Sequence, residues 1–166
     1  MRARIEAMLN NWRRKPPTRE GYLESAGALA AGRQSGLKPL WPRSPRMLTA
    51  TLDDGWGHGL DIIHALAEAV GVRVEPLGVL QPPETVVAAC RQQRPDLLGL
   101  TVLQFDADDA VRHILEQLPP HTTLIAGGAA YQFDPDFAGR TQTPYVARNG
   151  AAFLQFLLNY RLPGQT

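Results

Sequence analysis

The residues best suited to chemistry lie in one short stretch, DDGWGHG at positions 53–59. It holds two carboxylates that can bind protons or metals, an imidazole that can bind a metal, and an indole with a broad apolar face. Three glycines are interspersed among them, and a residue without Cβ allows another group to approach the backbone closely. The stretch therefore predicts a loop whose backbone a ligand approaches closely.

This loop is placed by the elements on either side of it. The apolar segment 47–52 precedes it, and the helical pattern GLDIIHALAEAVG (59–71) follows it. Further expected strands are 73–78, 96–103, 122–130 and 143–150, and further expected helices are 82–94, 106–118 and 151–162. Alternating strands and helices predict a flavodoxin-like (Rossmann-like) α/β fold, with five parallel strands and helices on both faces. Such folds bind ligands beyond the carboxyl ends of their strands.

Composition narrows the class of protein. The 166 residues are 44% hydrophobic and 20% charged, which is ordinary for one globular domain. The single cysteine, Cys90, excludes an internal disulfide and a thiolate metal cluster. No apolar run approaches the roughly 20 residues of a membrane span, and the N-terminus lacks a signal-peptide pattern. We therefore expect a cytoplasmic protein without a membrane association.

The charge is distributed unevenly along the chain. Residues 1–46 contain ten Lys/Arg and three acids, whereas the remainder contains seven arginines and thirteen acids. Residues 33–46 are rich in Pro, Gly and Ser and are typical of a linker. We therefore expect a basic extension at 1–46, with helices at 3–15 and 19–32, followed by a domain at 47–162 that folds without it. The extension is expected to lie against the acidic body of its own chain, and nucleic acid is not an expected partner.

Three familiar ligand-binding patterns do not fit the loop. No GxxxxGK[ST] phosphate loop occurs, and the glycine spacing G-x-G-x-G within 53–59 differs from the dinucleotide fingerprint. Asp53-Asp54 could imitate the acidic pair of a receiver domain. A receiver also needs an aspartate after the third strand and a lysine after the fifth, where this chain has TVLQ (101–104) and ARNG (147–150).

The chain resembles the cobalamin-binding domain shared by methionine synthase, corrinoid methyl-carrier proteins and methylmalonyl-CoA mutase. Asp54 and Gly59 match the ends of that family's D-x-H-x-x-G motif, and Thr101-Val102-Leu103 matches its S/T-x-L motif. Gly127-Gly128 matches its G-G motif, and the 41 residues from 60 to 100 are the family's spacing. The resemblance covers about residues 47–160.

The resemblance implies that the nucleotide tail of cobalamin is buried in a slot between the sheet and the helices. It implies that Gly59 packs against the tail, that Thr101 offers a hydroxyl and that Leu103 walls the slot. The glycine pair would leave space for the inserted ring, where any side chain would collide with it. Arg148 would contact the ribose or phosphate. The full set of expected cofactor-binding residues is Asp54, Gly55, Trp56, Gly57, His58, Gly59, Thr101, Val102, Leu103, Gly127, Gly128, Ala129, Arg148 and Asn149.

One departure from the family concerns the metal. Trp56 stands where the family has the histidine that binds cobalt, and an indole nitrogen has no free lone pair. Asp54, which would orient that histidine, thus loses its partner. Either the corrinoid is held without a histidine ligand, or the domain no longer binds it; His58 is a possible substitute ligand. The other histidines, His64, His113 and His121, are expected away from this edge.

No catalytic constellation is evident, and the N-terminal region is too short for the four-helix cap of methyl-carrier proteins. The resemblance thus implies a cobalamin-binding module that holds the cofactor base-off and serves a partner methyltransferase or radical enzyme. Two alternatives stay open. The chain could be a regulatory sensor for a corrinoid or another tetrapyrrole such as haem, or a degenerate family member without a cofactor.

Overall fold

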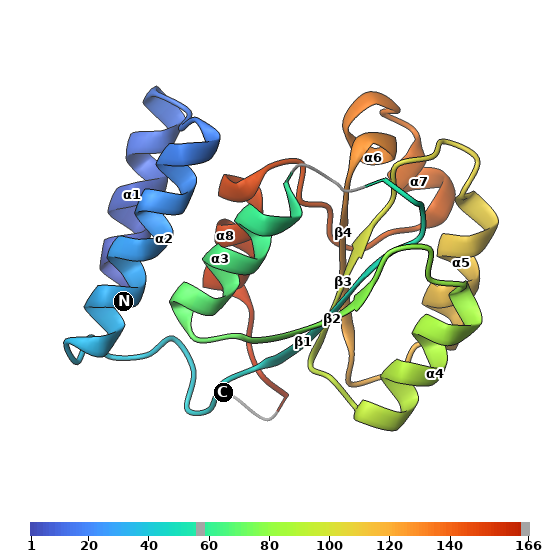
Figure 1. The fold of residues 1–166 in the computed structure, drawn as a ribbon, viewed down its shortest axis with the longest axis horizontal. Helices are drawn as coiled ribbons and strands as arrows, with labels where there is room; N and C mark the ends of the chain where they lie inside the picture. Colours follow the sequence, from blue (N-terminus) through green and yellow to red (C-terminus); the bar gives the residue numbers. More distant parts are fainter. Residues whose placement is uncertain (56–58, 164–166) are drawn as a thin grey trace.

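A computed structural model describes residues 1–55 and 59–163. Its sheet contains β1 (Arg46–Thr51), β2 (Arg73–Gly78), β3 (Leu97–Thr101) and β4 (Thr123–Gly127). The strands are parallel and lie in the order β2-β1-β3-β4, as Figure 1 shows. The expected flavodoxin-like architecture is therefore confirmed, with the loop after β1 at the point where the strand order reverses.

The sheet has four strands among the described residues, and the expected fifth strand at 143–150 does not form. Within the described residues, the segment 143–150 forms only an isolated parallel bridge between Ala126 and Val146 beside β4. Two backbone hydrogen bonds make this bridge, from Ala126 N to Tyr145 O (2.9 Å) and from Ala147 N to Ala126 O (2.8 Å). Pro144 has no N–H to extend the ladder, and Asn149 already caps the next helix, so the extended segment is too short for a strand.

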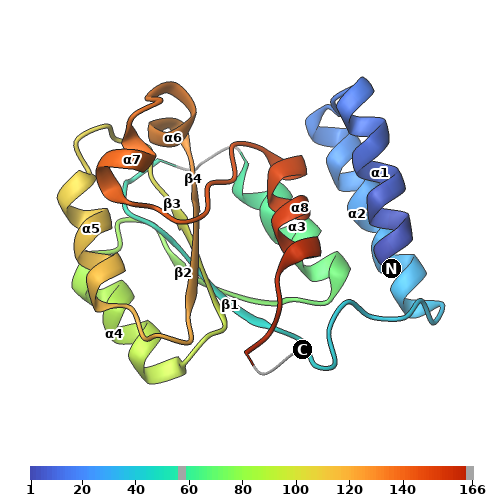
Figure 2. The ribbon, with the colours of Figure 1, turned by 180° about the vertical axis from the view of Figure 1, so that it is seen from behind.

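Helices cover both faces of the sheet (Figures 1 and 2). One face carries α3 (Leu60–Val70) and α8 (Gly150–Asn159), and the other carries α4 (Pro83–Gln93) and α5 (Asp108–Gln117). Two short helices, α6 (Ala129–Phe133) and α7 (Phe137–Thr141), follow β4. In residues 1–55 and 59–163, no helix is long and apolar enough to cross a membrane.

The two faces of the sheet differ in chemistry. Because side chains alternate along a strand, Leu48, Leu98 and Leu124 point towards α4 and α5, where they join a buried hydrophobic core. The alternate positions face α3 and α8, and several of them are small or polar, including Thr49, Gly99, Thr101 and Gly127. Small side chains cannot fill the space between sheet and helices, so this face is the one able to hold a ligand.

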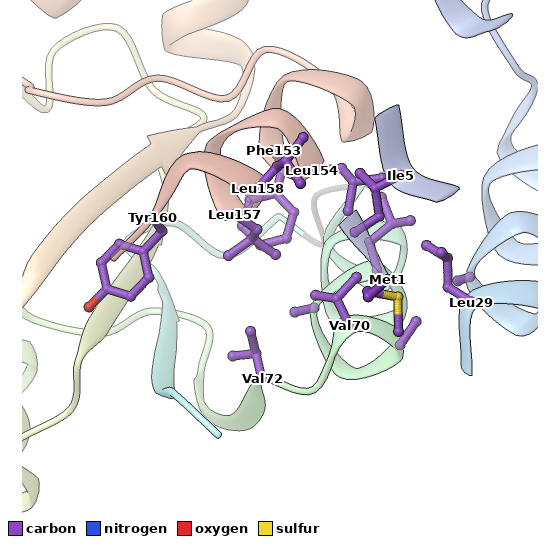
Figure 3. Close-up of a cluster of buried hydrophobic side chains, with 14 of the residues drawn as sticks. Met1, Ile5, Leu29, Val70, Val72, Phe153, Leu154, Leu157, Leu158 and Tyr160 are labelled. Carbon is purple, nitrogen blue, oxygen red and sulfur yellow. The ribbon is translucent and has the colours of Figure 1, made fainter. Parts of the chain in front are cut away.

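The N-terminal residues form a helical pair, α1 (Arg2–Arg14) and α2 (Arg19–Gln34), which packs outside α3 and α8. Figure 3 shows Met1, Ile5 and Leu29 in one buried cluster with residues of α3 and α8. Ion pairs join the basic segment to the acidic body, from Arg19 to Asp61 and from Arg43 to Asp96. The pair thus lies against its own chain, as its charge suggests, and shares its hydrophobic core.

The link from the helical pair to β1 is fastened at Asp96. Arg43 donates to both carboxylate oxygens, at 2.6 and 2.7 Å, and the amide of Arg46 donates to Oδ2 at 2.8 Å. Burial by itself would raise the pKa of Asp96, but these hydrogen bonds outweigh it and lower the pKa. The ionised carboxylate is thus the form that the fold prefers.

This network predicts a pH-dependent stability. A carboxylate whose pKa is lowered in the folded state stabilises the fold above its ordinary pKa of about 3.9, and this stabilisation is lost as the pH falls through the folded pKa. We expect Asp96→Asn to lower the free energy of unfolding by about 1–3 kcal/mol at neutral pH, and by much less in acid. Urea denaturation at both pH values measures this. Asp109→Asn, at a side chain 95% exposed, is the control, and equal effects of the two variants would contradict the prediction.

Candidate cofactor-binding site

A cavity of about 580 Å³ opens at the carboxyl edge of the sheet, on the face covered by α3 and α8. Its floor consists of strand residues from β1, β3 and β4, and its walls come from the helices and the turns that follow the strands. The lining residues are Tyr22, Met47, Thr49, Gly59, Leu60, Ile62, Ile63, Gly99, Leu100, Thr101, Leu103, Ile125, Ala126, Gly127, Gly128, Ala129, Gln132, Ala147, Arg148, Asn149, Gly150 and Phe153. The volume lies within the range of small-molecule and cofactor sites.

The floor exists because of small residues on adjacent strands. Gly99 pairs with Thr49 in β1 and with Ile125 in β4, and all three line the cavity. A Cβ at Gly99 would overlap Cε of Met47, so even one added carbon would enter the space next to the floor. The absence of a side chain at the centre of β3 is thus what deepens the cavity.

The mouth of the cavity is polar and cationic, unlike its floor. Arg148 is exposed, and its Nε donates to the carbonyl of Tyr131 at 3.3 Å. Asn149 caps α8, since its Oδ1 accepts from the amide of Ala152 at 2.8 Å. A helix N-terminus beside a guanidinium favours negative charge. An apolar interior with a cationic mouth suits a ligand that has a flat apolar group and a nearby anionic group.

Most of the expected site residues line this cavity. Asp54 is exposed and does not line it, and Val102 is fully buried in the core on the opposite face. Gly55 packs against Leu103 instead, where a Cβ would lie 2.5 Å from Cδ1. Trp56, Gly57 and His58 lie outside the described residues. The expected residues that do line the cavity are Gly59, Thr101, Leu103, Gly127, Gly128, Ala129, Arg148 and Asn149.

The glycine pair, which lines the cavity, is also required by the packing of the fold. Gly128 has φ +108°, and a Cβ there would overlap the carbonyl oxygen of Val102. At Gly127 a Cβ would lie 2.6 Å from the carbonyl oxygen of Ala147. A side chain at either position would therefore collide first with the protein's own backbone, so the glycines are required by the fold before any ligand is considered.

Gly128→Ala should consequently destabilise the fold. We expect a loss of about 2 kcal/mol or more, because the backbone conformation is nearly restricted to glycine and the added carbon overlaps Val102 O. Gly36→Ala is a matched control, since Gly36 also has positive φ (+90°) but open space around it; its cost should be about 1 kcal/mol. Thermal and urea unfolding compare the two variants. Equal losses would show that the contact with Val102 is unimportant.

Asp53 positions the turns beside the cavity without lining it, and the family motif did not single it out. It is buried, and its Oδ2 accepts from the amide of Leu103 at 2.6 Å. The bond ties the turn after β1 to the turn after β3, the two turns that border the cavity. Asp54 matches the family motif, but Asp53 makes this structural contact. The sequence signal that could have indicated this role is the position of the acid directly after a buried strand.

His64 lies on the inner side of α3, and its Nε2 is 3.0 Å from Oγ1 of Thr49. Burial lowers the pKa of His64, although Glu68 and Asp61 oppose this effect. The neutral imidazole thus holds the hydroxyl of a floor residue. Across the described residues, no group of three or more His, Cys, Asp and Glu could hold a metal ion.

A parallel, flavodoxin-like sheet with a deep, mostly apolar cavity at its carboxyl edge defines the chain as a cofactor-binding α/β domain. The family model of the B12 binding domain matches residues 48–152, which is more than half of the chain. The chain therefore belongs to the B12-binding domain family, and cobalamin is its cofactor.

Solved structures show the same fold. A cobalamin-binding protein from Desulfitobacterium hafniense DCB-2 is 21% identical, with a TM-score of 0.72 over 92% of this chain and 79% of that one. The methanol:cobalamin methyltransferase complex from Methanosarcina barkeri is 21% identical, with a TM-score of 0.62 over 92% of this chain and 61% of that one. The monomethylamine corrinoid protein of Methanosarcina barkeri is 22% identical, with a TM-score of 0.54 over 68% and 56%.

Two of the similar structures also match part of the N-terminal helical pair. In the first two structures the similarity covers 92% of this chain, more than residues 47–166 can supply, so the shared fold includes part of the helical pair. The chain spans less than two thirds of the second and third structures. No curated protein sequence matches the chain.

Proposed function

We propose that the chain holds a corrinoid base-off, with the nucleotide tail in the cavity and without a histidine ligand to cobalt, and presents it to a partner methyltransferase. The observation that carries the proposal is the cavity itself, which combines an apolar floor of small residues with a cationic mouth. A planar base fits the first feature, and the ribose phosphate of the tail fits the second.

The residues present fit this group. Met47, Ile63 and Ile125 give apolar contact for a planar base, and such contact is favourable because both surfaces leave water. Thr101 lines the cavity, and its neighbour in β1, Thr51, has a buried Oγ1 without a hydrogen-bond partner among the described residues. A hydroxyl on a mostly apolar floor, such as that of Thr101, is a group that can orient a ligand there.

The metal side of the proposal rests on Trp56. Tryptophan cannot donate an electron pair from its indole nitrogen to cobalt, so residue 56 cannot replace the family's histidine as a ligand. When bound, cobalamin supplies a cobalt centre that can carry a methyl group. The residues lining the cavity would hold the tail and exclude water from the base, and Arg148 would bind the phosphate.

A partner protein is supported by apolar side chains at the carboxyl edge. Leu80, Phe105 and Phe133 follow β2, β3 and β4 and are 62%, 50% and 69% exposed. Large apolar side chains this exposed near a binding cavity favour contact with another molecule. The exposed carboxylate of Asp106 directly follows Phe105, so the surface of the partner at this point should be basic.

Spectroscopic titration tests the proposal. The full chain is mixed with hydroxocobalamin, methylcobalamin and adenosylcobalamin, and passed over a size-exclusion column with detection of the visible spectrum. We expect co-elution and the spectrum of a base-off corrinoid, and weaker binding of cobinamide, which lacks the tail. Co-elution with an unchanged base-on spectrum would contradict insertion of the tail into the cavity.

A further inference from the structure

One part of the cavity wall comes from the N-terminal helical pair. Tyr22 of α2 lines the cavity and is only 9% exposed. The other described lining residues lie between Met47 and Phe153. Although the sequence pattern places residues 1–46 outside the binding domain, α2 therefore contributes directly to the boundary of the cavity.

Packing on several sides fixes the Tyr22 ring. Trp12 of α1 lies edge-to-face against it, with ring centroids 5.0 Å apart and planes at 75°. At Gly150, the first residue of α8, a Cβ would lie 2.9 Å from Cε1 of Tyr22, so the ring is pressed against the start of that helix. Thr18 caps α2 by accepting from the amide of Gly21 at 3.2 Å. The ring is thus a rigid part of the wall.

The surroundings of the ring are hydrocarbon. The same Cβ at Gly150 would lie 3.1 Å from Cγ2 of Ile62 and 3.1 Å from Cδ1 of Leu66. A wall of this kind contacts a ligand through apolar side chains and has few groups that can form hydrogen bonds. It therefore discriminates between ligands by the size of their apolar part, and one added group in a tight apolar pocket changes affinity by about tenfold or more.

We propose that Tyr22 is a specificity-determining residue that limits the size of the lower base of the corrinoid. This inference rests on the proposed function, because it assumes that the base lies in the cavity. The ring occupies volume into which a base larger than dimethylbenzimidazole would extend. The N-terminal helical pair thereby selects the cofactor as well as completing the core.

The test compares two corrinoids that differ only in the base, cobalamin and its naphthimidazolyl analogue. The Kd of each is measured by spectroscopic titration of the full chain, and the ratio of the two is the readout. The parent should prefer cobalamin. Tyr22→Ala should shift the ratio towards the larger base by about tenfold, since it opens the wall. Tyr22→Phe should keep the parental ratio because it keeps the ring.

Leu29→Ala is the matched control, because Leu29 is fully buried in the same helix and does not line the cavity. It should lower stability and leave the ratio unchanged. A ratio that stays parental in Tyr22→Ala, or that shifts equally in Tyr22→Phe, overturns the inference. If Tyr22→Ala is insoluble, Tyr22→Leu provides the same measurement. A parent that binds neither corrinoid overturns the proposed function instead.

Discussion

Gly99→Leu should reduce the affinity for cobalamin by about a hundredfold or more, equivalent to about 2.7 kcal/mol, while the chain stays folded. The new side chain projects from the centre of β3 onto the cavity floor, where it takes the volume proposed for the base. Its first obstacle is the end of the unbranched, flexible side chain of Met47, which lines the same cavity and can adopt another rotamer. Affinity is measured by titration and folding by thermal unfolding.

Gly139→Leu serves as the control for this variant. Gly139 lies in α7, away from the cavity, and a Cβ there meets no atom within 4 Å. It should leave both affinity and folding close to those of the parent. If Gly99→Leu binds cobalamin as tightly as Gly139→Leu, the floor of the cavity is not where the base lies.

Removing residues 1–46 should abolish cooperative unfolding, or leave the protein insoluble. The sequence pattern suggests the opposite, because the strands and helices of the sheet are complete without this segment. In the structure, however, Ile5 and Leu29 are fully buried in one cluster with Leu154 and Leu158 of α8 (Figure 3). Truncation would expose this apolar surface to water. Differential scanning calorimetry of the fragment 47–166 is the measurement.

A milder variant measures the same contact within the full chain. Leu29→Ala should lower the free energy of unfolding by about 2–5 kcal/mol, the usual cost of a cavity in a packed core. Leu80→Ala removes the same atoms from an exposed site and should change stability by no more than about 0.5 kcal/mol. A stable, cooperative fragment together with a small loss in Leu29→Ala would show that the helical pair is an appendage.

The sheet could be predicted from the sequence because its signals are local. The apolar run at 96–103 contains β3, and segments 47–52 and 122–130 contain most of β1 and all of β4. The fifth strand was overestimated, since Pro144 and the cap at Asn149 leave little backbone free to pair. Helices α6 and α7 were not predicted, because five residues are too few to show a helical period.

The site was predicted less completely, because it depends on contacts between distant residues. The motif glycines 127 and 128 could be located, but their neighbours, the carbonyls of Ala147 and Val102, follow only from the packing of the turns. Tyr22 carries no sequence signal for ligand contact, since its helix meets the cavity only through tertiary packing. The spacing of motifs in the sequence can indicate the family, whereas the role of each residue depends on tertiary contacts.

Electron paramagnetic resonance of cob(II)alamin bound to the full chain tests the central claim most directly. A nitrogen below the cobalt splits each cobalt line into a triplet, and that nitrogen can come from the benzimidazole of the tail or from a histidine. With the base in the cavity and Trp56 in place of the family's histidine, we expect lines without nitrogen splitting. Splitting that persists in His58→Ala would show that the base still binds cobalt and lies outside the cavity, and splitting that disappears in that variant would make His58 the ligand; either result would contradict the account.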